Sequence, residues 1–193
     1  MIAYYYIKKE ETEETSDCGL KLSKWCDTEI IIDIFKKKAI TAYLTPKDNI
    51  RKYMDPDYDC LKLELNDEKA YIVENVFFET GHQELYLNSV IPARQYKVGM
   101  YRKPAFTITY TVLGEFISVL DKNRDIPILF ENDEEQYLKT LMAKLENEDT
   151  HFYDRALHGY FENNSQFTKI ESDNKKYSIY ESSGQHYIIR MKR

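Results

Sequence analysis

Three side chains near residue 155 have the types and the spacing of a metal site. His151, Asp154 and His158 are three and four residues apart, so on a helix all three lie on one side. Imidazole and carboxylate groups suit zinc or iron, but such a site usually has three or four protein ligands. The sequence offers no fourth ligand, and a solvated helix face opposite Phe152 and Phe161 explains the same pattern. We therefore predict no metal site.

The cysteines offer a second kind of chemistry. A thiolate beside an imidazole is a nucleophile, and Cys18, Cys26 and His82 are of the required types. Nothing in their spacing places them together, and small buried cysteines are common in protein cores. The chain has three cysteines, Cys18, Cys26 and Cys60, which is an odd number, and no two of them form a CxxC pair. This pattern indicates free thiols in a reducing cytoplasm.

Several strong motifs are absent, and the charged clusters have simple explanations. The chain has no GxGxxG, GxxxxGK, HExxH or GxSxG, which weighs against Rossmann oxidoreductases, P-loop enzymes, zincins and α/β-hydrolases. An acidic run comprises Glu131, Asp133, Glu134 and Glu135. Acids in a first helical turn favour the helix dipole, which is a sufficient reason for that run. The sequence leaves two candidates for a local basic patch: residues 36–38, and the set Arg94, Lys97, Arg102 and Lys103.

The composition is that of one folded domain over residues 1–193. Hydrophobic residues make up 42% of the chain, and 17 tyrosines and 9 phenylalanines supply a large packing area. The net charge of −6 opposes broad nucleic-acid binding, because it repels polyphosphates at long range. No apolar run approaches the roughly 20 residues of a membrane helix, and the N-terminus lacks a basic segment ahead of an apolar one. We expect a cytoplasmic protein without a membrane segment.

The apolar pattern predicts strands at both ends of the chain and helices between them. Strands are expected at residues 2–8, 30–35, 39–44, 61–65, 70–74, 106–112 and 126–130. Residues 36–38 are interpreted as a turn, and residues 66–69 as the turn of a hairpin. Two further strands, 177–180 and 187–190, form a C-terminal β-hairpin. The predicted class is α+β, with a mostly antiparallel sheet, inserted helices and that C-terminal β-hairpin.

Two helices have clear start signals. Thr45 is an N-cap, Pro46 follows at the first helical position, and Asp48 supplies an acid three residues after the cap. These residues predict a helix over 45–55. Asn132 caps another helix over 133–147, whose apolar stripe comprises Leu138, Leu141, Met142 and Leu145. A third helix is expected over 152–161.

Four short segments, taken in order, resemble the ADP-ribosyltransferase-like superfamily, particularly bacterial members near the DNA-thymidine ADP-ribosyltransferases. They are residues 4–8 (YYYIK), 18–23 (CGLKLS), 42–46 (AYLTP) and 101–105 (YRKPA). The family has a first strand with a polar residue, a short helix ending in a Gly-Leu step, a strand with a tyrosine, and a catalytic Glu before a late strand. The resemblance covers residues 2–112 and implies a domain that binds NAD or a related nucleotide ligand.

The resemblance also implies roles for single residues. Tyr5 stands near the place of the polar residue that holds the ribose, and Tyr43 near the aromatic residue that stacks on nicotinamide. Ala105 falls where the family has the carboxylate that stabilises an oxocarbenium ion, so the chain resembles a degenerate member. Glu84 or Glu115 would be the substitute carboxylate, although no motif marks either one. Whether the domain is catalytic stays open.

A function of a different class fits the same composition. Tyrosine is enriched in binding surfaces because its rigid ring offers a large contact area at low entropy cost. An acidic, tyrosine-rich surface would serve a non-catalytic protein-interaction or inhibitor protein. The two hypotheses require different surfaces: a nucleotide site needs a cleft with convergent donors and a stacking ring, whereas an interface needs a flat aromatic patch.

Overall fold

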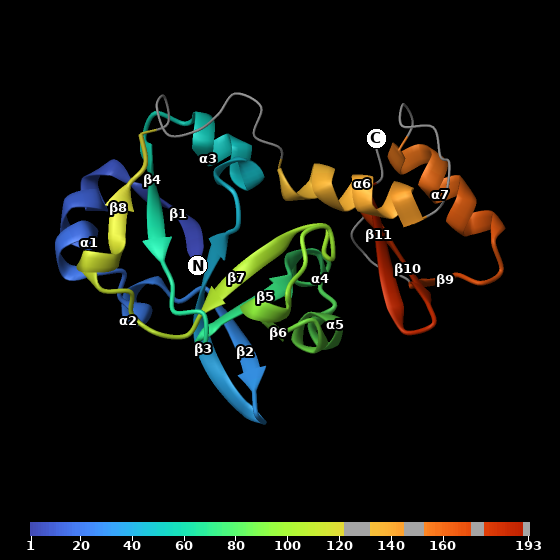
Figure 1. Cartoon of the computed structure of the whole chain (residues 1–193), viewed down its shortest axis with the longest axis horizontal. Helices are drawn as coiled ribbons and strands as arrows, with labels where there is room; N and C mark the ends of the chain where they lie inside the picture. The colour runs from blue at the N-terminus through green and yellow to red at the C-terminus, as the bar shows by residue number, and fades with distance from the viewer. Residues whose placement is uncertain (122–131, 145–152, 171–175, 191–193) are drawn as a thin grey trace.

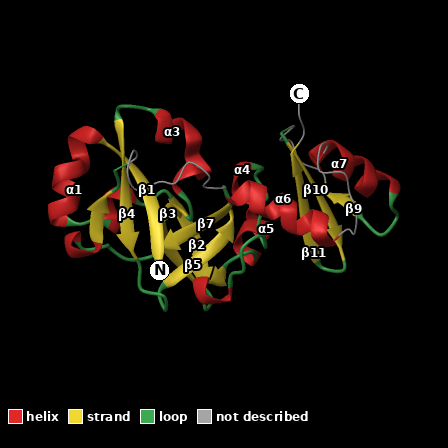
Figure 2. Ribbon diagram, turned by 45° about the horizontal axis from the view of Figure 1, so that its top comes forward, coloured by secondary structure: helices red, strands yellow, loops and turns green. Residues whose placement is uncertain are grey.

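The computed structural model describes residues 1–121, 132–144, 153–170 and 176–190, and it has two sheets with helices packed around them (Figure 1, Figure 2). The larger sheet has the strand order β6-β5-β7-β3-β1-β4-β8, and β2 pairs with β3 off this path. The smaller sheet has the order β11-β10-β9. Neighbouring strands are antiparallel, and β10 and β11 form the predicted C-terminal hairpin. The predicted α+β class is confirmed.

The elements follow the chain in this order. The strands of the larger sheet are β1 (Ile2–Lys8), β2 (Thr28–Ile32), β3 (Phe35–Tyr43), β4 (Tyr58–Glu64), β5 (Ala70–Glu74), β6 (Ile91–Pro92), β7 (Pro104–Ile108) and β8 (Ile117–Val119). The smaller sheet has β9 (Thr168–Ile170), β10 (Tyr177–Ser182) and β11 (Gln185–Arg190). The α-helices are α1 (Thr12–Cys18), α2 (Leu22–Trp25), α3 (Ile50–Met54), α4 (Asn75–Glu79), α5 (Gln83–Asn88), α6 (Asp133–Lys144) and α7 (Tyr153–Asn163). Short 3-10 helices are η1 (Lys9–Glu11), η2 (Pro46–Asn49), η3 (Ala93–Gln95) and η4 (Gly114–Phe116).

The central strands of the larger sheet present different side chains on their two faces. Tyr43 of β3 is opposite Tyr4 of β1 and opposite Ala105 of β7, and side chains alternate along a strand. These three residues therefore lie on one face. The other face carries the larger core, which includes Ala3, Ala42, Leu61, Leu63, Ile72 and Phe106. The face of Tyr43 borders the cleft described below.

β2 and β3 form a hairpin that projects from the rest of the sheet (Figure 1). Its turn lies at Asp33 and Ile34, whose φ angles of 48° and 71° match the positive values of a type I′ turn. The prediction of a turn at residues 36–38 is wrong, because these lysines belong to β3. The buried Ile30 and Ile32 set the register, since both must share one face of the hairpin.

β4 and β5 are consecutive strands that do not pair with each other. β4 lies between β1 and β8, whereas β5 lies between β7 and β6. The predicted hairpin around residues 66–69 is therefore wrong, although both strands form where expected. Alternation along the sequence identifies a strand and its buried face, whereas contacts between distant segments choose its partner.

The C-terminal elements have a core of their own and share another with the larger sheet. Leu141 of α6 is buried, as predicted, and Leu138 is half-buried. Their cluster comprises Tyr137, Leu141, Leu157, Phe161, Tyr180 and Ile189. A second cluster joins Tyr177, Ile179 and Ile188 of the smaller sheet to Val73 and Val76. The side chains of Met142 and Leu145, and the predicted strand 126–130, lie outside the described residues.

The structure also bears on the thiols and on membrane spans. Cys18 is exposed, Cys26 is half-buried and Cys60 is buried, and all three are free. The helices within the described residues include none that is long and apolar enough to cross a membrane.

Candidate functional site

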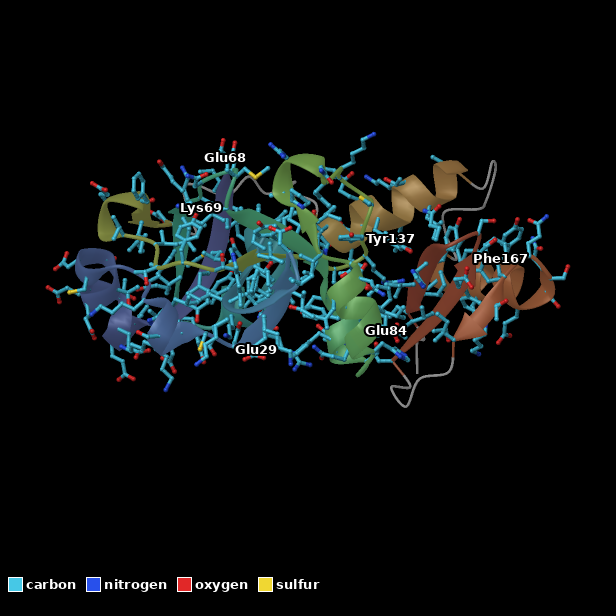
Figure 3. All side chains as sticks on the ribbon, turned by 90° about the horizontal axis from the view of Figure 1, so that it is seen from below. Glu29, Glu68, Lys69, Glu84, Tyr137 and Phe167 are labelled. Atoms are coloured by element: carbon cyan, nitrogen blue, oxygen red, sulfur yellow. The ribbon has the colours of Figure 1, made fainter. Side chains whose placement is uncertain are left out.

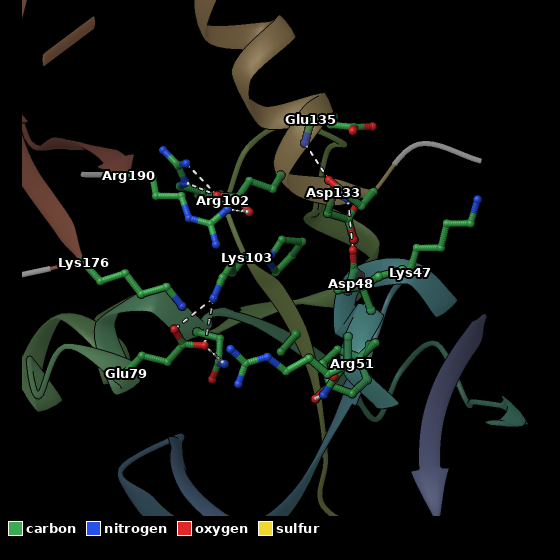
Figure 4. Close-up of a pocket in the computed structure, with 18 residues that line it drawn as sticks. Lys47, Asp48, Arg51, Glu79, Arg102, Lys103, Asp133, Glu135, Lys176 and Arg190 are labelled. Atoms are coloured by element: carbon green, nitrogen blue, oxygen red, sulfur yellow. Dashed lines mark hydrogen bonds and ion pairs between the residues drawn. The ribbon is translucent and has the colours of Figure 1, made fainter. Parts of the chain in front are cut away.

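A cleft with a volume of about 670 Å³ lies where the larger sheet, η2, α3 and α4 meet α6 and the smaller sheet (Figure 4). Tyr43, Pro104 and Ala105 contribute its sheet wall, and Asn49 and Asn75 add neutral polar groups. The other lining side chains are mostly charged. The cations are Lys47, Arg51, Arg102, Lys103, Lys176 and Arg190, and the acids are Asp48, Glu79, Asp133, Glu134 and Glu135. The cleft therefore combines an aromatic ring with groups of both charges.

Tyr43 is the aromatic residue of the cleft, and its neighbours fix its ring. The hydroxyl accepts a hydrogen bond from Asn49 Nδ2 at 2.7 Å, and the ring meets Tyr6 edge to face at 5.9 Å. Tyr6 in turn donates a hydrogen bond to the carbonyl of Pro46, which ties η2 to β1. Burial raises the pKa of the Tyr43 hydroxyl, and the carboxylates of the surroundings, including Asp48, raise it further. The contacts with Asn49 and Tyr6 hold the ring in place at the wall of the cleft.

The second predicted binding residue lies elsewhere. Tyr5 is opposite Leu61 in the pairing of β1 with β4, on the face of the larger core. Its ring contacts Trp25 edge to face at 6.1 Å. The structure therefore places Tyr5 and Tyr43 on opposite faces of the sheet and does not bring them together.

The carboxylates considered as substitutes for the family's Glu are also remote from the cleft. Ala105 is opposite Tyr43 in the pairing of β3 with β7, and both residues line the cleft. Glu84 is exposed on α5 (Figure 3), and Glu115 is exposed in η4. Neither lines the cleft. An acid that does line the cleft is Glu79 of α4, which forms an ion pair with Lys103 at 3.0 Å.

Positive charge is concentrated at the end of the cleft next to the smaller sheet, where Figure 4 shows Lys103, Lys176 and Arg190 together. The positive charge of Lys103 lowers the pKa of Lys176, and burial and Arg190 lower it further. Glu79 pairs with Lys103, and Glu134 lies 3.5 Å from Arg190. Burial lowers the pKa of Lys103, but a hydrogen bond to Tyr177 and the pairing with Glu79 raise it overall, so the charge of Lys103 is partly balanced. This end is suited to an anionic group such as a phosphate.

Arg102 is fully buried and holds the C-terminal elements in place. Its Nε and Nη2 donate to Glu134 Oε1 at 2.9 and 2.6 Å. Nη1 and Nη2 donate to the carboxylate of Asp154 at 2.7 and 3.1 Å, and Nη1 also donates to the carbonyl of Ile188 at 2.8 Å. These five bonds use every N–H of the guanidinium group. Arg102 is thus a structural cation that joins β7 to α6, α7 and β11.

Glu74 positions the backbone that carries Arg102 and Lys103. Its carboxylate is buried and accepts the N–H groups of Arg102 at 2.6 Å, Lys103 at 3.0 Å and Val76 at 3.2 Å. Burial raises the pKa of Glu74 to about 7, although these hydrogen bonds act in the opposite direction. Glu74 therefore fixes the start of β7, where the cleft begins.

Asp48 and Asp133 form a carboxyl pair at the other end of the cleft (Figure 4). Asp48 Oδ2 accepts the N–H of Thr45 at 2.9 Å, which confirms the predicted helix start, and Oδ1 accepts the N–H of Asp133 at 3.1 Å. Asp133 is 5% exposed, and its side chain lies against that of Asp48. Burial, the adjacent charge of Asp48 and a hydrogen bond between the two side chains raise the pKa of Asp133 to about 9. Two carboxyl groups this close hold one proton between them near neutral pH.

The remaining residues considered for chemistry do not form a site within the described residues. Asp154 is bound by Arg102, and His158 lies 3.3 Å from Glu162, while His151 lies outside the described part. No group of three metal-ligating side chains occurs among the described residues. Glu131 also lies outside them.

Sequence reasoning missed most of the cleft. Lys103 was included in a basic patch, but Lys176 and Arg190 carry no local signal. Asp48 and Asp133 were both interpreted as helix-start acids, which they are, and nothing in the sequence shows that the two helix starts meet. No family model, no curated protein and no solved structure matches the chain.

Proposed function

We propose that this protein binds NAD or a related nucleotide in the cleft beside Tyr43. The observation that carries the proposal is the combination of a fixed, half-buried tyrosine ring and a cluster of cationic side chains in one cleft of about 670 Å³. A planar base or nicotinamide ring stacks on an aromatic side chain, and phosphates bind where lysine and arginine side chains converge. The proposal is for binding, because the family resemblance puts Ala105, which has no carboxylate, at the place of the catalytic Glu.

Calorimetric titration with NAD, ADP-ribose and mononucleotides tests this proposal. Tyr43→Ala should weaken binding at least about fivefold, because stacking of a base on an aromatic ring contributes about 1–3 kcal/mol. Tyr43→Phe is the matched control, since it keeps the ring and removes only the hydroxyl that accepts from Asn49. Release of nicotinamide from NAD would add transferase or hydrolase activity to the binding function.

Charge is tested in the same assay with a second pair of variants. Lys176→Ala removes a cleft cation, whereas Lys69→Ala removes an exposed cation in the turn after β4 (Figure 3). We expect only the first to weaken binding and to reduce its dependence on salt. Absence of binding by every nucleotide, in a folded protein, would refute the proposal.

The second candidate function is a non-catalytic protein-interaction or inhibitor role, and the projecting β2–β3 hairpin is the observation that favours it. Ile34 is 88% exposed and Phe35 is 65% exposed at its tip, where an apolar surface has no packing role. The tyrosines give less support: those in the described part whose exposure is known are buried or half-buried, with Tyr160 as the exception. A partner that binds wild type and Tyr43→Ala but not Phe35→Asp, detected by cross-linking, would establish this role.

A further inference from the structure

The tip of the β2–β3 hairpin carries apolar side chains that face solvent. Ile34 is 88% exposed and Phe35 is 65% exposed, and the partly exposed Ile31 lies just before the turn. Ile34 also has a φ of 71°, a conformation that a β-branched residue rarely adopts. This residue therefore costs stability and solubility, and little packing offsets either cost. Strained backbone of this kind is concentrated at functional sites.

The hairpin is a rigid projection and not a loose loop (Figure 1). Ile30 and Ile32 of β2 are buried in the cluster that they share with residues of α4 and α5. At the base of the hairpin, the carboxylate of Asp27 accepts both the N–H and the hydroxyl of Thr41, each at 2.9 Å. The base thus holds the apolar tip at a fixed place beyond the body of the protein.

The three exposed lysines of residues 36–38 follow the tip along β3 and lie on both faces of the hairpin. The first and the third are opposite Ile31 and Glu29 of β2, so they share one face. The second alternates to the other face, which is the face of Phe35. None of the three lysines forms an ion pair with a described residue. Positive charge therefore surrounds the hairpin directly behind its apolar tip.

The order of these groups along the hairpin matches the order of groups in a lipid leaflet. A strand rises about 3.3 Å per residue, so the lysines follow Phe35 at roughly 3 to 10 Å. Apolar side chains of surface-bound proteins enter the boundary of headgroups and acyl chains by about 5–10 Å. At that depth of the tip, the lysines reach the level of the phosphates, to which an anionic leaflet attracts them.

We propose that the β2–β3 hairpin attaches this protein to the surface of an anionic lipid bilayer, with Ile34 and Phe35 among the acyl chains and the lysines of residues 36–38 at the lipid phosphates. The contact is with one leaflet and needs no membrane-spanning segment. This inference is independent of nucleotide binding, and it gives the hairpin a partner of a different class from the second candidate function.

Two features favour a lipid surface over a protein partner. Lipid surrounds an inserted hairpin on every side, which matches lysines on both faces, whereas a protein partner contacts mainly one face. The tip also offers only three large apolar side chains, Ile31, Ile34 and Phe35. A stable protein interface involves about 20–30 residues on each side.

The acids of the hairpin make the attachment weak and reversible. Glu29 is opposite Lys38, and Asp33 lies in the turn beside Ile34. Residues 28–39 contain three lysines and two acids, a net charge of +1, whereas the whole chain carries −6. Charges of the body that lie more than about 8 Å from the lipid are largely screened at physiological ionic strength. Asp33 is therefore the one group of the tip whose neutralisation should strengthen attachment.

Sedimentation with lipid vesicles tests the proposal. Wild type should bind vesicles of phosphatidylcholine with about 30% phosphatidylserine, and should bind pure phosphatidylcholine several-fold more weakly. Lys37→Ala should weaken binding about fivefold, because one lysine at an anionic surface contributes that much. Lys69→Ala, an exposed lysine elsewhere (Figure 3), is the matched control and should change binding less than twofold.

The apolar tip is tested with a second matched pair. Phe35→Ser should weaken binding at least about fivefold. Val98→Ser is its control, since Val98 is also 65% exposed but lies outside the hairpin. Circular dichroism verifies that each variant is folded.

Two variants of the turn have effects that a loss of folding cannot produce. Asp33→Asn should strengthen binding to the anionic vesicles, because it removes a negative charge from the tip. Ile34→Gly should weaken binding even though glycine relieves the strain at this φ.

The proposal is overturned if wild type does not bind the anionic vesicles or binds both kinds equally. It is also overturned if a hairpin variant and its control lose the same amount, or if Asp33→Asn weakens binding. A protein partner of the hairpin without vesicle binding would overturn it in favour of the second candidate function. Nucleotide titration is a separate measurement, so the proposed function can stand or fail by itself.

Discussion

Arg102→Met tests whether a single buried cation holds the C-terminal elements on the larger sheet. The methionine side chain fills much of the space of the arginine stem, so the main loss is the charge and its five hydrogen bonds. The carboxylates left behind are largely shielded from water: the Glu134 side chain is 21% exposed and the Asp154 side chain 12% exposed. Removing one partner of a buried ion pair costs about 3–5 kcal/mol, because an uncompensated charge stays buried. That is a large share of the total stability of a domain, about 5–15 kcal/mol.

Urea unfolding measures this loss with two probes. Circular dichroism follows all the secondary structure, whereas the fluorescence of Trp25, the single tryptophan, follows the larger sheet. Arg190→Met is the matched control, because its pair with Glu134 is 3.5 Å long and its side chain is 43% exposed. Exposed pairs contribute about 0–1 kcal/mol. In Arg102→Met the dichroism transition should also precede the fluorescence transition, if α6 to β11 detach first.

A third variant separates the lost bonds from the orphaned charges. Adding Glu134→Gln and Asp154→Asn to Arg102→Met removes both unpaired carboxylates and should recover part of the stability. The reasoning is refuted if Arg102→Met costs no more than Arg190→Met, or if the triple variant is less stable than the single one.

Four further predictions concern the core, the carboxyl pair, the hairpin turn and the thiols. Leu141→Ala should cost about 2–5 kcal/mol in urea unfolding, because Leu141 is buried between α7 and the smaller sheet; no loss would mean that the site is solvated. The pKa of Asp133 is about 9 in the folded protein and near 3.9 in an unfolded chain. Between these pH values the folded state binds more protons than the unfolded state, so the free energy of unfolding falls as the pH rises. Asp133→Asn should therefore be more stable than wild type at pH 8.5, with a smaller difference at pH 5. Ile34→Gly should stabilise the protein by about 1 kcal/mol in thermal melts, since Ile34 has a φ of 71° and glycine carries no penalty there. The three cysteines are free, so a reductant should change neither the melting temperature nor the monomer mass.

Local signals predicted the elements well where a few adjacent residues decide the outcome. Thr45, Pro46 and Asp48 start a helix because a cap is made within one turn. The C-terminal hairpin forms because its two strands are neighbours along the chain. The lysines at residues 36–38 were assigned to a turn, but they belong to β3. A run of lysines indicates only that the segment is exposed, and an exposed strand of a projecting hairpin suits lysine as well as a turn does.

The site was beyond local signals because its parts meet only in the folded chain. Tyr43 was identified through a family resemblance, and the structure places it in the cleft. Tyr5 was assigned by the same route, but one position in a strand decides the face, and it lies on the other side. The pairing of Asp48 with Asp133 joins two helix starts that are 85 positions apart, which no spacing rule anticipates.

The bond between Arg102 and the carbonyl of Ile188 spans 86 positions, and this separation sets an order of assembly. During translation the strands of the larger sheet leave the ribosome well before β10 and β11 do. At roughly 5–20 residues per second, the interval is on the order of seconds. During this interval the segments that contain Tyr43 and Lys103 have been synthesised, whereas the segment that contains Lys176 and Arg190 has not. A nascent chain with a folded sheet therefore has half a cleft, and the cleft is complete only when the last strand has docked on Arg102.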